Sequence, residues 1–231
     1  MYKVILWDID GTLLNFEKAE EAGIRGCFEK FQLGECTEIM LAAYKKLNRS
    51  YWQKLERGEI EKSVLLIKRF EDFLSAYGLD TSVAAEFNAL YQILIGDTVV
   101  FCEHALETVQ ALKGKVLQCA VTNGTRVAQD RKLKNSGLYQ ELDHIFISEE
   151  VGIEKPNKGF FDVVFAEIGA YAPDEVLIVG DSLTSDIQGG VNAGIRTCWF
   201  NPKGAENTSG LRPDYEITDV GEVLEIVKGL R

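Results

Sequence analysis

Two aspartates stand two residues apart near the start of the chain, directly after a short apolar stretch. In the segment KVILWDIDGT, Asp8 and Asp10 follow residues 3–7, which have the pattern of a buried strand. A carboxylate can serve as a nucleophile or a metal ligand, and a second one nearby can act as a general acid and base. The pair could therefore carry out covalent catalysis with proton transfer.

Similar polar residues follow other apolar runs. Thr122-Asn123-Gly124 ends the run 115–122, Lys155-Pro156 comes after 144–148, and Asp181 follows 175–180. Because ligands of open α/β sheets gather at the carboxyl ends of the strands, we expect these groups to meet Asp8 and Asp10 there. Each one alone could be a turn residue or a helix cap. Three carboxylates together, however, need a cation to offset their repulsion.

Mg²⁺ suits such a set, because it prefers hard oxygen ligands and retains several waters. We expect Asp8, Asp181 and the main-chain carbonyl of Asp10 to be its ligands. The predicted reaction is attack by Asp8 on a phosphomonoester to give an aspartyl phosphate. Asp10 would protonate the leaving oxygen and then take a proton from the hydrolytic water.

The phosphate itself needs donors and positive charge. The Lys155 ammonium and the Thr122 hydroxyl are the predicted catalytic groups that hold it. Backbone N–H groups of the turn at Asn123 and Gly124 are predicted to bind the remaining phosphate oxygens.

The elements that position these residues alternate along the chain. The apolar runs are separated by amphipathic stretches at about 125–136, 158–169 and 184–193, a pattern typical of a parallel sheet covered on both faces. A loop at 201–214 leads to a last short strand, YEIT, and a closing helix. Residues 15–97 lack a comparable run and carry apolar residues at helical spacing. We therefore expect an α/β core of 1–14 and 98–231, interrupted by a helical unit over 15–97.

Composition excludes several classes of function. The 231 residues carry a net charge of -11, which disfavours nucleic-acid polymers as partners but leaves small phosphorylated substrates open. No segment approaches the roughly 20 apolar residues of a membrane span, and the N-terminus lacks a signal-peptide pattern, so a cytoplasmic location is expected. The five cysteines form no CxxC pair, which argues for reduced thiols and against structural zinc.

Taken in order, the motifs resemble the four motifs of the haloacid dehalogenase-like (HAD) hydrolase superfamily, and the resemblance covers the whole chain. They are Asp8-x-Asp10-Gly-Thr, the Thr122 strand end, Lys155-Pro156, and Gly180-Asp181 through Asp186. The resemblance implies a Rossmann-like three-layer core and a type-1 cap formed by the helical insertion. It also implies that Asp186 supports Lys155 or a metal-bound water.

Two further stretches, 147–162 and 179–202, resemble YjjG-type pyrimidine 5′-nucleotidases. That resemblance implies a nucleoside monophosphate such as UMP, dUMP or dTMP as the substrate. Aromatic residues of the insertion could stack on the base, and Phe16 and Trp52 are the predicted contacts. Aromatic residues at helical spacing are also the usual sign of core packing.

Several alternatives share these motifs. A phosphatase or phosphomutase acting on sugar phosphates, or a phosphatase acting on phosphoglycolate, would need the same groups. A haloacid dehalogenase would need no acid for its leaving group, so Asp10 argues against it. A catalytically silent binding module would have no use for the full set of reactive side chains.

Overall fold

The computed structural model describes residues 1–229, which form two compact units. One unit combines Met1–Asn15 with the chain from Val99 onward, and the other is Phe16–Thr98. The first unit contains the sheet, whereas the second contains only helices, turns and loops. Within residues 1–229, no helix is both long enough and apolar enough to cross a membrane.

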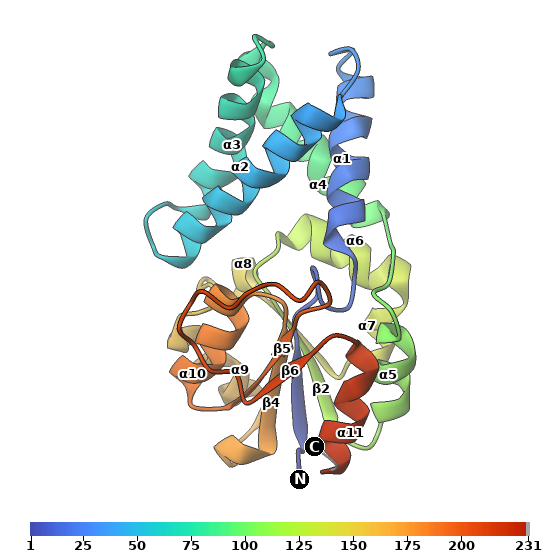
Figure 1. The fold of residues 1–231 in the computed structure, drawn as a ribbon, viewed down its shortest axis with the longest axis vertical. Coiled ribbons are helices and arrows are strands. Elements are labelled where there is room, and N and C mark those ends of the chain that lie inside the picture. The colour runs from blue at the N-terminus through green and yellow to red at the C-terminus, as the bar shows by residue number, and fades with distance from the viewer. Residues whose placement is uncertain (230–231) are drawn as a thin grey trace. The chain divides into compact units, whose positions relative to one another are not determined.

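A six-stranded parallel sheet forms the centre of the first unit, with the order β3-β2-β1-β4-β5-β6 (Figure 1). The strands are β1 Val4–Trp7, β2 Leu117–Thr122, β3 His144–Ile147, β4 Val176–Gly180, β5 Arg196–Phe200 and β6 Tyr215–Ile217. The strand order switches sides at β1, which pairs with both β2 and β4: β2 and β3 lie on one side of it, and β4, β5 and β6 lie on the other. Crevices at such a switch point, outside the carboxyl ends of the strands, are where open α/β sheets bind ligands.

Both faces of the sheet are covered, and the side chains of β1 alternate between two apolar layers. Ile5 and Trp7 belong to the layer that includes residues of α5 (Ala105–Leu112), α6 (Arg126–Ser136), α7 (Leu138–Glu141) and α11 (Val223–Lys228). Val4 and Leu6 pack on the opposite side with α9 (Lys158–Ile168). In Figure 1, α5 and α11 lie on one side of the strands and α9 on the other. Burial on both faces explains why the strands are apolar almost without interruption.

The second unit consists of α1 Phe16–Lys30, α2 Glu38–Glu56, α3 Lys62–Ala76 and α4 Ala84–Asp97, with a short 3₁₀ turn at Thr81–Val83. Aromatic side chains form its interior: the rings of Tyr44 and Phe70 stack 5.4 Å apart, and Tyr91 meets Phe70 edge-on at 5.2 Å. The buried guanidinium of Arg69 lies over two of these rings and donates to Asn48 Oδ1 at 2.7 Å. This unit therefore has a core of its own.

The α/β class and the predicted strands are confirmed, including the last one at Tyr215–Ile217. The expected helix at 184–193 differs in its first half. There the chain forms a wider π-helical turn at Leu183–Ile187, and α10 (Gln188–Ala193) follows. Elsewhere, the short helix α8 (Ser148–Val151) follows β3. The side chain of Ser182 accepts from the N–H of Ser185, and the Asp186 side chain turns back toward the sheet. Wide turns of this kind occur frequently at functional sites.

Candidate active site

Asp8 comes directly after β1, in the middle of the sheet, and both of its carboxylate oxygens have partners. Lys155 Nζ donates to Oδ1 at 2.9 Å, and the Thr12 hydroxyl donates to Oδ2 at 3.2 Å. The residue is only 7% exposed. Burial and the nearby charge of Asp186 raise the pKa of Asp8 to about 7, although Lys155 acts in the opposite direction. The carboxylate is thus fixed in orientation and largely removed from water.

Lys155 is the cation at the centre of this cluster and is 1% exposed. Besides Asp8, its ammonium donates to Asp186 Oδ1 at 2.6 Å and to the carbonyl of Val121 at 2.5 Å. Burial alone would lower the pKa of Lys155, but the charges of Asp186 and Asp8 outweigh it and raise the pKa. The lysine therefore remains charged at neutral pH.

The side-chain amide of Asn123 holds the loop that carries Lys155. Its Nδ2 donates to the Lys155 carbonyl at 2.8 Å, and its Oδ1 accepts from the Lys155 N–H at 2.9 Å. Asn123 thus connects the end of β2 to the lysine loop. With its amide engaged in this way, its predicted contact with phosphate would have to come from its backbone.

Three carboxylates meet at this edge of the sheet. One oxygen each from Asp8, Asp181 and Asp186 lies within 4.8 Å of the other two. Asp186 is engaged on both sides, because Oδ1 accepts from Lys155 and Oδ2 accepts from the N–H of Ser182 at 3.1 Å. Asp181 is exposed as a residue, but its carboxylate is surrounded by protein atoms. Desolvation of the carboxylate, followed by the charge of Asp8, raises the pKa of Asp181 well above the usual value.

This donor set fits Mg²⁺. The ion favours hard oxygen ligands, and the single ammonium of Lys155 leaves the three carboxylates with an excess of negative charge. Gly11 contributes space: its φ is +99°, and a Cβ there would lie 2.6 Å from Asp181 Oδ2. Only glycine leaves the Asp181 carboxylate in its present place next to Asp8.

The side chain of Asp10 is held by helix α6 and does not belong to this cluster of three. Gln129 Nε2 donates to Asp10 Oδ2 at 2.5 Å, and the Lys132 ammonium forms an ion pair with Oδ1. Gln129 is fully buried and Lys132 is 1% exposed. Sequence reasoning missed both residues. The available signal was their spacing of three, which places them on the same side of the predicted helix as the buried Leu133.

Thr122 and Gly124 shape the turn between β2 and α6. The Thr122 hydroxyl is buried and accepts from the Gly124 N–H at 3.0 Å, which leaves its own proton available to another acceptor. Gly124 also makes room for a neighbour, because a Cβ at this position would lie 2.1 Å from Gln129 Nε2.

Phe16 and Trp52 belong to the helical unit, not to the strand-end cluster. Phe16 is the first residue of α1 and is half-buried. Trp52 is also half-buried and packs against a cluster that contains Tyr51, Leu55 and Leu65. Contact of these two aromatic rings with the substrate stays a prediction.

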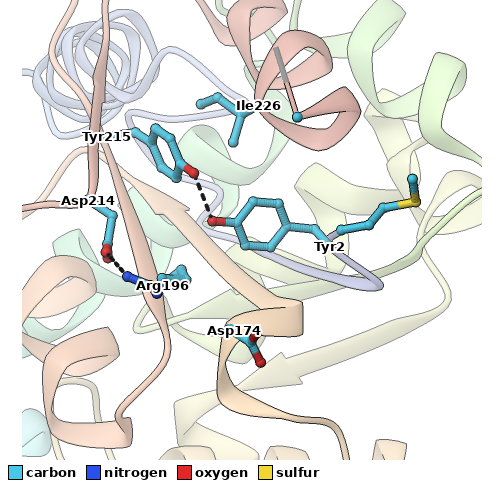
Figure 2. A pocket seen from close by; sticks show the side chains of 8 residues that line it. Tyr2, Asp174, Arg196, Asp214, Tyr215 and Ile226 are labelled. Carbon is cyan, nitrogen blue, oxygen red and sulfur yellow. Dashed lines mark hydrogen bonds and ion pairs between the residues drawn. The ribbon is translucent and has the colours of Figure 1, made fainter. Parts of the chain in front are cut away.

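A surface hollow lies at the opposite edge of the sheet, where strands begin (Figure 2). The hydroxyl of Tyr2 donates to that of Tyr215 at 3.2 Å, and Arg196 donates to Asp214 at 2.6 Å. These polar groups pair with one another, and no residue of the Asp8 cluster lines the hollow. Open α/β sheets bind ligands at the other edge, outside the carboxyl ends of the strands, where the Asp8 cluster lies.

Comparison with known proteins agrees with the geometry. YfnB of Bacillus subtilis (strain 168) is 34% identical over 226 residues, which cover 98% of this chain and 95% of YfnB. The pyrimidine 5′-nucleotidase PynA of Streptococcus pneumoniae is 32% identical over 97% of this chain and 94% of its own length. The pyrimidine 5′-nucleotidase YjjG of Escherichia coli (strain K12) is 29% identical over 96% of each chain.

Solved structures show the same fold. The crystal structure of YfnB bound to magnesium matches with a TM-score of 0.91 at 34% identity, over 98% of each chain. The L-2-haloacid dehalogenase of Xanthobacter autotrophicus matches with a TM-score of 0.77 at 19% identity, over the whole of both chains. A family model described as haloacid dehalogenase-like hydrolase spans residues 2–194. The chain therefore belongs to the haloacid dehalogenase-like hydrolase family.

Proposed function

We propose that the protein is a phosphomonoester hydrolase in which Asp8 is the nucleophile. One observation carries this proposal: the buried Asp8 carboxylate is held by Lys155 and Thr12 beside two further carboxylates. Lone carboxylates near strand ends often cap helices, but helix capping requires neither a buried ammonium nor two further carboxylates nearby. Nucleophilic attack on phosphorus does require a fixed oxygen and positive charge close to it.

The reaction is proposed to run in two displacements. In the first, an Asp8 oxygen bonds to phosphorus as the ester P–O bond breaks, and Asp10 gives its proton to the departing oxygen. In the second, water bonds to phosphorus as the P–O bond to Asp8 breaks, and Asp10 takes the proton from that water. The Thr122 hydroxyl holds a phosphate oxygen throughout. The Lys155 ammonium, whose three donors go to Asp8, Asp186 and the Val121 carbonyl, adds positive charge beside the phosphate.

Mg²⁺ is the proposed cofactor, with Asp8, Asp181 and the main-chain carbonyl of Asp10 as its ligands. When bound, the ion would neutralise phosphate and carboxylate charge, so that an anionic nucleophile can approach an anionic ester. Asp186 has a different proposed role. Because its two oxygens are engaged by Lys155 and the Ser182 N–H, it orients the lysine.

Asp10 favours a phosphatase over a dehalogenase. A halide departs without a proton, whereas an alkoxide needs one, and Asp10 is the second carboxylate that can supply it. Solved dehalogenases at about one-fifth identity share the fold, which does not by itself establish their reaction for this chain.

Pyrimidine nucleoside monophosphates are the proposed substrates. Two relatives that align along nearly the whole chain, PynA and YjjG, are described as pyrimidine 5′-nucleotidases. A base could stack on the side chains of Phe16 or Trp52, which is worth about 1–3 kcal/mol per base. Small sugar phosphates are the second candidate, because a 28% identical relative from Methanopyrus kandleri is described as a glyceraldehyde 3-phosphate phosphatase.

Phosphate release from a substrate panel tests the proposal. The panel contains UMP, dUMP, dTMP, AMP, ribose 5-phosphate, glyceraldehyde 3-phosphate and phosphoglycolate, each assayed with Mg²⁺ and with EDTA. We expect the three pyrimidine nucleotides to have the highest kcat/KM and EDTA to abolish turnover. A sugar phosphate that exceeds them would favour the second candidate. The absence of phosphate release from every compound would contradict the phosphatase assignment.

A further inference from the structure

The side chain of Asp10 is fixed by two buried donors that lie far from it in the sequence. Lys132 contacts Oδ1 and Gln129 contacts Oδ2, so each oxygen of the carboxylate has a donor of its own. Both donors come from α6, and the residues are separated from Asp10 by 122 and 119 positions. Two donors on one rigid helix leave the carboxylate little freedom to rotate.

Burial of the Lys132 and Gln129 side chains is unfavourable for the stability of the fold. An ion pair with a buried ammonium contributes little to stability compared with apolar side chains of similar size, because the ammonium loses its water. The Lys132 ammonium lies on a side chain that is 1% exposed. Gln129 Oε1 is buried and has no hydrogen-bond partner among the described residues. Packing alone would favour apolar residues at both positions.

The turn after β2 makes room for this arrangement. A Cβ on Gly124 would lie 2.1 Å from Gln129 Nε2, so the absence of a side chain there lets the amide reach Asp10. The same glycine donates its N–H to Thr122. The turn that is predicted to bind phosphate and the contact to Asp10 are therefore parts of one local structure.

We propose that Lys132 and Gln129 are positioning residues that aim the Asp10 carboxylate at the leaving-group oxygen. The inference rests on the proposed phosphatase function and extends it to two residues outside the cluster of Asp8, Asp181 and Asp186. Its consequence is specific to proton transfer. Loss of either donor should impair esters whose leaving group needs a proton and should spare esters whose leaving group departs as a stable anion.

Two substrates separate these cases: UMP has an alkoxide leaving group, whereas 4-nitrophenyl phosphate releases a stable phenolate. The parameter to measure is kcat/KM, because it reports only the steps up to departure of the leaving group. For Lys132→Met we expect kcat/KM with UMP to fall about 10²-fold, the lower end of what general acid catalysis contributes. With 4-nitrophenyl phosphate it should stay near the wild-type value.

Five further variants complete the test. Lys132→Arg keeps a cationic donor and should restore most of the activity on UMP. Gln129→Leu should lower kcat/KM with UMP without lowering the midpoint of urea unfolding, because it also removes a buried acceptor without a partner. Lys134→Met changes an exposed lysine of the same helix and is the matched control. In the background of Asp10→Ala, Lys132→Met should cause no additional loss.

The outcomes distinguish the inference from the function on which it rests. An equal loss on both esters, or an additional loss in the Asp10→Ala background, would overturn the positioning role while leaving the phosphatase function intact. Faster turnover of UMP by Lys132→Met would also overturn it, because the lysine would then hold Asp10 away from the substrate. If the wild-type protein hydrolysed neither ester, the proposed function would fall, and this inference with it. A crystal structure of Lys132→Met should show the Asp10 side chain rotated, and an unmoved side chain would contradict the inference.

Discussion

Replacing Lys155 by methionine should destabilise the metal-free protein by about 3–5 kcal/mol, the usual result of removing one partner from a buried ion pair. The Lys155 ammonium is the shared partner of Asp8 Oδ1 at 2.9 Å and Asp186 Oδ1 at 2.6 Å, and the residue is 1% exposed. Its hydrogen bond to the carbonyl of Val121 is lost as well. Methionine fills much of the space of the lysine stem, so most of the loss comes from the uncompensated charge.

Urea unfolding in EDTA measures this loss as a shift of the midpoint at constant slope. Lys158→Met is the matched control, because Lys158 is an exposed lysine in an i,i+4 pair with Asp162 and should change stability little. The double variant Lys155→Met/Asp186→Asn should recover part of the loss, since it removes one stranded charge and retains an acceptor for the Ser182 N–H. The reasoning is refuted if Lys155→Met costs no more than the control, or if the double variant is less stable than the single one.

Three other predictions concern the metal, the pH dependence and the packing. Mg²⁺ at 100 times its dissociation constant should stabilise the wild type by about 2.7 kcal/mol, and Asp181→Asn should lose most of that gain in a thermal unfolding assay; an unchanged gain would remove Asp181 from the ligand set. The hydrogen bond from His104 to Asp219, at 2.7 Å, raises the pKa of His104 above 6.5, so its contribution to stability is complete below that pH and is lost as the pH rises through the raised value. The stability difference between wild type and His104→Asn should therefore shrink with rising pH in urea titrations, and a constant difference would contradict the pairing. Gly180→Ala places a Cβ 2.2 Å from Asp186 Cγ, so it should cost about 1–3 kcal/mol in urea unfolding and lower phosphatase activity, whereas full activity would show that Asp186 can shift freely.

Much of the sheet could be predicted because its strands are buried on both faces. Uninterrupted apolar runs such as VILW leave little ambiguity, and the first polar residue after each run marks the strand end. The positions of Asp8, Lys155 and Asp181 at one edge follow from that pattern, together with the rule that parallel strands end on the same side. Their proximity is visible in the structure, whereas their catalytic roles remain predictions.

Helix α6 shows where sequence reasoning stops. Its sequence, RVAQDRKLKNS, is mostly polar, which is typical of a helix that faces water, yet Gln129 and Lys132 are buried. Lysine is buried only when a specific partner compensates its charge, and that partner, Asp10, is 122 positions away. The spacing of the two residues places them on one side of the helix, but a local pattern does not identify a partner at that distance.

The turn at Leu183–Ile187 illustrates a second limit. Its apolar spacing predicts an ordinary helix, but Asp186 also has to reach Lys155 beneath the end of β4. The chain forms a wider turn where Asp186 makes this contact. Because Lys155 lies on another loop, the sequence of the turn alone does not reveal the contact.

Rapid acid quenching of a reaction between the enzyme, Mg²⁺ and the preferred phosphomonoester, followed by peptide mass spectrometry, tests the central claim most directly. The account predicts that the peptide containing Asp8 carries one added phosphoryl group during turnover, and that Asp8→Asn abolishes both this adduct and phosphate release. If phosphate were released without any phosphoryl group on Asp8, or if Asp8→Asn remained active, the proposed mechanism would be contradicted.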